Sequence, residues 1–226
     1  MEQHPCPVID ALPERDRTTL LDRAVPRHLR RRQTLYFAGE RERRVHVVVD
    51  GVLKLSARNG SGTETILGLA TPGDIAGDVA AIDQLPQPFD AVAATPCDVI
   101  GLDADLFLEI VSRNAPAVLE LATGLATRMR WMCDTAMERT SSEISGRLAG
   151  RLLDLADVLG RVNEGAVEMD IPLAQADLGQ LAGMCRESAC KTLRKFKADG
   201  VVDYRGRKLR ILRPDVLERI RCAGRA

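Results

Sequence analysis

Residues 174–197 read AQADLGQLAGMCRESACKTLRKFK and contain the most informative pattern of the chain. Leu178 and Leu181 have the spacing of a helix. Gly183 follows, and a glycine adopts positive φ in a tight turn without steric cost. A second helix begins directly after the turn. Its apolar side chains recur at helical spacing and are expected to face the first helix: Ala189, Leu193 and Phe196. The stretch therefore predicts a helix-turn-helix.

The opposite face of the second helix is polar and basic, and a hairpin with a basic turn follows at residues 201–212. The start of such a helix fits the major groove of DNA, where Arg186 and Lys191 suit guanine and Glu187 suits cytosine. Lys195 and Lys197 are better placed for phosphates. The alternative is a solvated helix start beside a basic surface. We expect the DNA-binding residues to be Arg186, Glu187, Ser188, Cys190, Lys191, Arg194, Lys195, Arg205 and Arg207.

Charge is distributed unevenly along the 226 residues. The chain has 32 basic and 32 acidic residues, so its net charge is zero. Residues 1–144 hold 16 basic against 21 acidic residues, whereas residues 145–226 hold 16 against 11. This pattern indicates a sensor or assembly domain joined to a domain that binds a polyanion. Aromatic residues make up only 3% of the chain, which argues against a platform for base stacking.

The first half of the chain has the pattern of short strands. From Gln33 to about Leu102, β-branched runs alternate with turns that contain glycine or proline. This spacing predicts an antiparallel barrel, roll or sandwich. The preceding segment, residues 15–32, has helical spacing and is expected to form a helix outside the strands.

A long helix follows the predicted strands. Its apolar residues alternate steps of four and three, as in a heptad stripe that pairs with a second helix. The stripe comprises Ala115, Leu119, Ala122, Ala126, Met129, Cys133 and Ala136. An ordinary buried helix is the alternative. The cluster Ser141-Ser142-Glu143 interrupts the pattern, and a new amphipathic helix is expected over residues 144–159.

With these residues in view, the chain resembles the cAMP receptor protein and fumarate-nitrate regulator (CRP/FNR) superfamily of bacterial transcription regulators. The glycine pattern of its nucleotide-binding roll is present at Gly39, Gly51 and Gly73, and Arg186-Glu187-Ser188 followed by Lys191 is similar to its recognition helix. The resemblance implies a homodimer, joined by the long helix, on a near-palindromic site. The expected fold is α+β: a β-roll sensor domain (1–114), a dimerisation helix (115–140) and a winged helix-turn-helix domain (141–226).

The effector pocket departs from the pattern of that superfamily. The resemblance places the pocket at Gly77, Asp78, Val79, Gln87, Pro88, Met132 and Cys133. Gln87-Pro88 stands where an arginine would neutralise a cyclic phosphate, and Met132-Cys133 replaces the Thr-Ser pair that contacts the base. Because residues 59–112 contain neither Lys nor Arg, we expect no cation at the position of the phosphate and no orthodox cAMP binding.

The remaining signals give no cofactor. Cys6 alone cannot supply the cysteine row of an iron–sulfur cluster, and His4, His28 and His46 lie outside the long helix that would hold a haem ligand. The sequence has no C-x-x-C pair of the kind that would indicate a zinc site. Cys133 and Cys190 leave open a cysteine-based redox sensor.

The expected function is therefore sequence-specific regulation of transcription, with double-stranded DNA, a second copy of the chain and RNA polymerase as partners. Without a signal peptide or a membrane span, the protein is expected in the cytoplasm. A regulatory module that acts on another protein is one alternative, but it has no use for the basic hairpin. An enzyme is another, but the chain lacks a paired nucleophile and base, a phosphate loop and a metal-ligand cluster.

Overall fold

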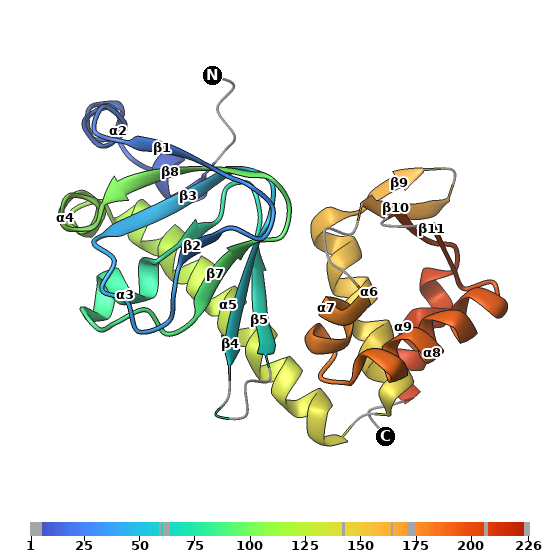
Figure 1. The fold of residues 1–226 in the computed structure, drawn as a ribbon. Helices are drawn as coiled ribbons and strands as arrows, with labels where there is room; N and C mark the ends of the chain where they lie inside the picture. The colour runs from blue at the N-terminus through green and yellow to red at the C-terminus, as the bar shows by residue number, and fades with distance from the viewer. Residues whose placement is uncertain are drawn as a thin grey trace. The chain divides into compact units, whose positions relative to one another are not determined.

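The computed structural model describes residues 6–58, 60, 64–141, 143–163, 165–170, 175–205 and 208–223. The chain forms two compact units, residues 1–130 (unit 1) and residues 131–226 (unit 2). The long helix α5 (Ala115–Ser141) contributes to both units (Figure 1). The three domain limits expected from the sequence stay predictions.

Unit 1 is built on two four-stranded antiparallel sheets. In the first sheet, the strand order is β1 (Val25–Leu29), β8 (Cys97–Asp103), β3 (Arg44–Asp50) and β6 (Ile75–Ala76). In the second sheet, the order is β2 (Thr34–Tyr36), β7 (Asp90–Ala93), β4 (Leu53–Arg58) and β5 (Glu64–Ala70). A core cluster combines buried side chains of both sheets, among them Leu29, Val48, Leu53 and Ala91. The expected antiparallel β domain is confirmed.

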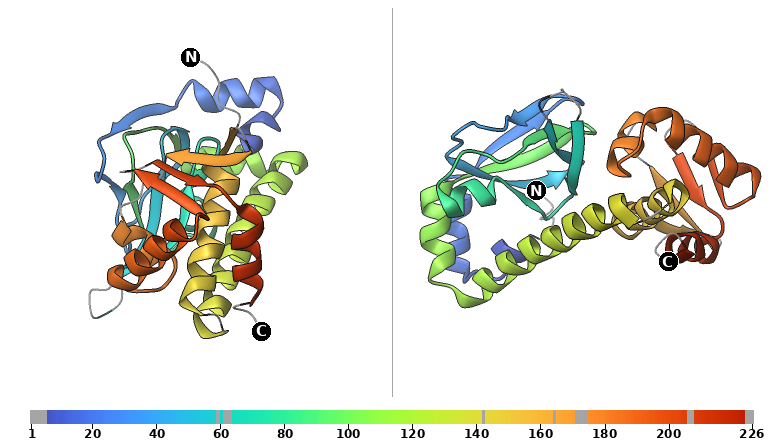
Figure 2. Two further views of the ribbon diagram at one scale, coloured as in Figure 1. Left: turned by 90° about the vertical axis from the view of Figure 1, so that its right-hand side faces the viewer. Right: turned by 90° about the horizontal axis from the view of Figure 1, so that it is seen from below.

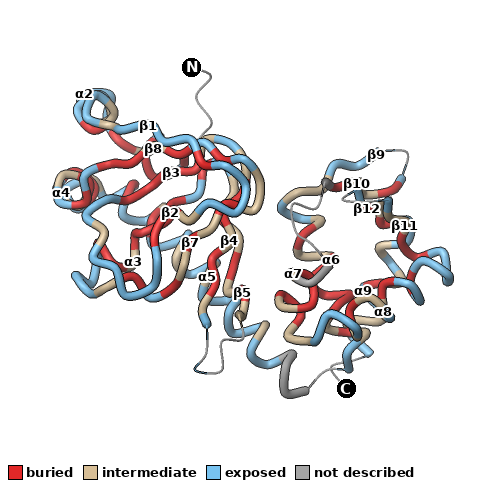
Figure 3. Tube along the Cα trace, viewed as in Figure 1, coloured by how far each residue is buried: buried red, intermediate tan, exposed pale blue. Residues whose placement is uncertain are grey.

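Helices cover the other face of the first sheet. They are α1 (Pro7–Asp10), α2 (Glu14–Leu21), α4 (Ala104–Ser112) and the first turns of α5. Strand β3 is buried along most of its length (Figure 3). Both of its faces are covered, because Val45 and Val47 pack in the helix-side cluster while Val48 packs between the sheets. A strand of this kind reads as a continuous apolar run in the sequence.

The predicted helix over residues 15–32 is wrong in its second half. Helix α2 ends at Leu21, and the chain then forms β1, which pairs antiparallel with β8. Pro26 explains the change: it has no N–H to donate and would disrupt a helix interior, but it is tolerated in an edge strand such as β1.

Two further features concern the end of the roll. The last part of the strand-rich region forms two strands, β7 and β8, which belong to different sheets. The short helix α3 (Asp78–Asp83) has no counterpart among the predictions. Its N-cap residue is Gly77, whose φ of 88° is a left-handed conformation that favours glycine.

Unit 2 combines helices with one small antiparallel sheet (Figure 2). Its helices after α5 are α6 (Ile144–Leu159), α7 (Gln175–Leu181), α8 (Arg186–Ala198) and α9 (Pro214–Ala223). The sheet has the order β11 (Val202–Arg205), β12 (Lys208–Ile211), β10 (Ala166–Asp170) and β9 (Arg161–Asn163). Helix α6 packs against α7, α8 and α9 and so forms the centre of the unit. Of the predicted hinge, Ser142 lies outside the described residues.

Candidate nucleic-acid interface and effector pocket

Helices α7 and α8 form the predicted helix-turn-helix. The inner face of α8 is buried, with Ala189 fully enclosed and Leu193 and Phe196 each 2% exposed. Gly183 in the turn has φ of 61°, as its position before the second helix predicts. The packing of this face orients the opposite face of α8 toward solvent.

Most of the predicted DNA-binding side chains on α8 are exposed. The exposed ones are Arg186, Glu187, Lys191, Arg194 and Lys195. Ser188 and Cys190 are only partly exposed. Cys190 sits next in sequence to the buried Ala189, and the rotation of 100° per residue leaves it at the edge of the packed face.

Cys185 occupies the N-cap position of α8, and the sequence analysis did not include it in the site. Its Sγ lies 3.2 Å from the Ser188 Oγ in an exposed position. The hydrogen bond with the Ser188 hydroxyl lowers the pKa of the Cys185 thiol, and the backbone N–H groups of Ser188 and Glu187 act in the same direction. A cysteine directly before a predicted helix is the sequence signal that could have found it.

Strands β11 and β12 form the predicted hairpin, in register from Val202 opposite Ile211 to Arg205 opposite Lys208. Arg205 is exposed at its end, whereas Arg207 lies outside the described residues. The expectation that Lys197 contacts phosphate is not supported by its surroundings. Its Nζ lies 2.7 Å from the Asp203 carboxylate and donates to the Tyr204 carbonyl oxygen at 3.2 Å. Lys197 therefore ties α8 to the hairpin.

The predicted effector pocket falls mainly at the start of α3. Gly77 and Asp78 are buried there, and the Gln87 amide lies nearby, since its Nε2 is 3.3 Å from the position a Cβ on Gly77 would take. Neither polar atom of the buried Gln87 side chain has a hydrogen-bond partner among the described residues. Val79 is half-buried and Pro88 is exposed. Met132 and Cys133 are exposed side chains of unit 2.

A cation that the sequence analysis did not assign to the pocket lies at the start of α3. Arg128 extends from α5 to the start of α3, where its Nη1 lies 2.9 Å from the carboxylate of Asp78 and its Nη2 donates to the Ile75 carbonyl oxygen at 3.0 Å. Asp78 is 2% exposed in this pair and the Arg128 side chain 18%. This cation lies outside residues 59–112, because it comes from α5, a helix that follows the β domain in sequence.

Comparison with known families accounts for both units. Residues 26–114 match the family described as cyclic nucleotide-binding domain, and residues 146–220 match the Crp-like helix-turn-helix domain. The chain belongs to the CRP/FNR superfamily. It is a transcription regulator of the CRP/FNR type with a helix-turn-helix DNA-binding domain.

Relatives of this CRP/FNR protein are similar over most of their length. A CRP-like cAMP-activated global transcriptional regulator of Mycobacterium tuberculosis is 26% identical over 80% of this chain and 81% of its own. The cAMP-activated global transcriptional regulator CRP of Salmonella typhimurium is 22% identical over 79% and 85%. Among solved structures, FixK2 from Bradyrhizobium japonicum has a TM-score of 0.77 at 20% identity, covering 87% of this chain and 96% of its own. The FixK2 structure therefore shares the fold of this chain.

The heptad stripe of this CRP/FNR protein is exposed along its whole length. All seven stripe residues are exposed, and Leu119 and Met129 are 66% and 65% exposed. Leu121 of α5, which is not part of the stripe, is buried against the β domain. The alternative of an ordinary buried helix therefore does not fit, because this stripe lies in solvent.

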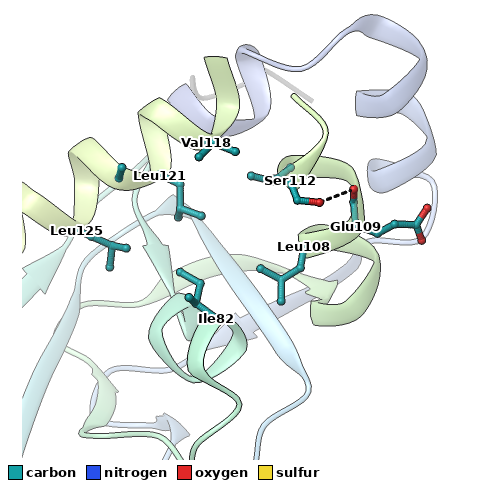
Figure 4. A pocket seen from close by; sticks show the side chains of 9 residues that line it. Ile82, Leu108, Glu109, Ser112, Val118, Leu121 and Leu125 are labelled. Carbon is teal, nitrogen blue, oxygen red and sulfur yellow. Dashed lines mark hydrogen bonds between the residues drawn. The ribbon is translucent and has the colours of Figure 1, made fainter. Parts of the chain in front are cut away.

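An open apolar pocket of about 450 Å³ lies in unit 1 between α3, α4 and α5 (Figure 4). Ile82, Leu108 and Leu121 line it from these three helices. Its lining shares no residue with the predicted effector pocket.

None of the helices in the described ranges combines the length and the apolar character that a membrane span requires. No group of three or more His, Cys, Asp or Glu side chains there is placed to hold a metal ion.

Proposed function

We propose that the protein acts as a homodimer that binds a near-palindromic site in double-stranded DNA, with one α8 in the major groove of each half-site. The observation that carries this proposal is the exposed row of Arg186, Glu187 and Lys191 on a helix whose other face is fully packed. Arginine and lysine donate to guanine O6 and N7, and glutamate accepts from the cytosine amino group. The row therefore suits G·C pairs.

The exposed apolar stripe on α5 supports a dimer that is paired through this helix. The exposed stripe has the heptad spacing of a two-helix interface. Leu119 and Met129 are its most exposed large side chains, so their burial against a second α5 would contribute most to the stability of a dimer. A dimer places two recognition helices on the two halves of a palindrome.

Control by cAMP does not fit the pocket. Arg128 is already neutralised by Asp78, and Gln87 stands where the phosphate-binding arginine is expected. We propose that the protein binds DNA without cAMP, that another effector or none controls it, and that RNA polymerase is its partner in transcription.

The test is selection of bound sequences from genomic DNA fragments, followed by footprinting and a salt titration of the selected site. The expected result is a footprint with two-fold symmetry and an affinity that falls steeply with salt, because phosphate contacts release counterions. A basic surface without sequence readout would give the salt dependence and no footprint, and that result would overturn the proposal.

A further inference from the structure

Arg151 of α6 is the largest fully enclosed side chain of the described chain, with only 1% of its surface exposed. Its Nη1 lies 2.9 Å from the Asp154 carboxylate and donates to the Thr135 hydroxyl at 3.1 Å. Its guanidinium carbon lies 5.1 Å from the centre of the Trp131 ring. A buried cation is thus held by an anion, a hydroxyl and an aromatic face.

These contacts connect three helices of unit 2. Trp131 and Thr135 belong to the last part of α5, whereas Arg151 and Asp154 belong to α6. Asp154 also lies 3.5 Å from Arg221 of α9. Because α6 packs against α7, α8 and α9, a group that ties α5 to α6 ties it to the whole helix-turn-helix.

Stability alone does not account for a charge in this position. Burying an ion pair costs several kcal/mol of hydration, and replacing such pairs with apolar side chains is often neutral or stabilising. A guanidinium, however, is planar and presents its donors in a fixed fork, so it imposes a direction on its partners that an apolar contact does not.

We propose that Arg151 is a positioning residue for DNA recognition. It fixes the angle at which the helix-turn-helix leaves α5, so that the two α8 helices of a dimer match the spacing of the two half-sites. This inference rests on the proposed dimeric binding to a palindrome, and it goes beyond that proposal by naming the side chain that sets the geometry.

The test compares the DNA affinities of Arg151→Met and of the unmodified protein. Two DNAs are used: the selected palindrome, and the same site with one half scrambled. We expect Arg151→Met to bind the scrambled site within about twofold of the unmodified protein and to lose at least tenfold on the palindrome. Arg219→Met is the matched control, because Arg219 is an exposed arginine of α9 whose partner Asp215 is also exposed. It should leave both affinities unchanged. Trp131 is the only tryptophan of the chain, so its fluorescence should change in Arg151→Met alone and reports the loss of the contact directly.

Two further variants keep the test decisive if Arg151→Met does not fold. Thr135→Val removes the acceptor on α5 and leaves the pair with Asp154 intact, and Arg151→Lys keeps the charge without the planar fork. Both should lose the preference for the palindrome in part. An unchanged preference in all folded variants would overturn the inference, as would equal losses on both DNAs, which indicate a structural role only. If the unmodified protein itself shows no preference for the palindrome, the dimeric function fails, and the positioning role fails with it.

Discussion

The Arg128 guanidinium on α5 lies 2.9 Å from the carboxylate of Asp78 at the start of α3, so the pocket expected to hold an effector already contains a closed ion pair. Within the described chain, the pair joins residues 50 positions apart and connects α5 to the β domain of unit 1. An anionic ligand has to compete with Asp78 for the Arg128 guanidinium.

The first prediction concerns cAMP. Because Arg128 is neutralised and Gln87 carries no charge, addition of cAMP should change the affinity for the DNA site by less than about threefold, or about 0.7 kcal/mol. A ligand shifts an equilibrium only through different affinities for the two states, and neither the ion pair nor the base contact of orthodox binding is available. Isothermal titration of the protein with cAMP and with cGMP measures whether either nucleotide binds. A micromolar dissociation constant for either would contradict the prediction.

The second prediction separates base contacts from phosphate contacts on α8. Arg186→Ala and Glu187→Ala should each weaken specific binding by about 1–3 kcal/mol and relax base preference, because both lie at the exposed start of the helix. Lys195→Ala should weaken all sequences alike. Competition assays with specific and random DNA distinguish the two outcomes. Equal losses on both DNAs for Arg186→Ala would remove it from the base-reading set.

The third prediction concerns the dimer. Met129→Glu should dissociate it, since a carboxylate at a side chain now 65% exposed would become an unpaired charge inside the apolar interface. DNA affinity should fall together with the dimer, because two linked modules share an effective concentration that one lacks. Sedimentation velocity at several protein concentrations measures the state. An intact dimer for Met129→Glu would place the interface elsewhere.

The fourth prediction concerns the stability of unit 1 at low pH. Burial lowers the pKa of His46 from 6.5 to about 4, and the charges of Arg27 and Arg44 act in the same direction. The unfolded state therefore binds the proton first, so stability present above pH 6.5 is lost as the pH falls toward 4. The loss from this group is on the order of 3 kcal/mol.

Urea unfolding between pH 4 and pH 7, followed by circular dichroism, tests this effect. The pH dependence should be weaker in His46→Gln than in the unmodified protein, because glutamine does not titrate. Parallel pH profiles would show that His46 does not contribute.

Local sequence patterns were sufficient for much of the fold. The helix expected over residues 144–159 is α6 with the same limits, and the alternation of apolar residues in α8 identified Ala189, Leu193 and Phe196 as its packed face. The predicted helix over residues 15–32 is wrong beyond Leu21, because Pro26 disfavours a helix interior and is tolerated in an edge strand. The location of α3 was missed because a six-residue helix has too few turns to establish a period.

Features that depend on neighbours along the chain could be predicted from the sequence: the strand-rich first half, the long α5, the helix-turn-helix with its hairpin, and hence the superfamily. Periodicity and turn residues carry that information, since they act over a few positions. The partners of the buried charged side chains could not be predicted in this way. Arg128 reaches Asp78 and Arg151 reaches Trp131 through the packing of separate elements, and no spacing rule connects such residues. The physical reason is that burial makes an ion depend on its particular partners, and those partners are chosen by the fold.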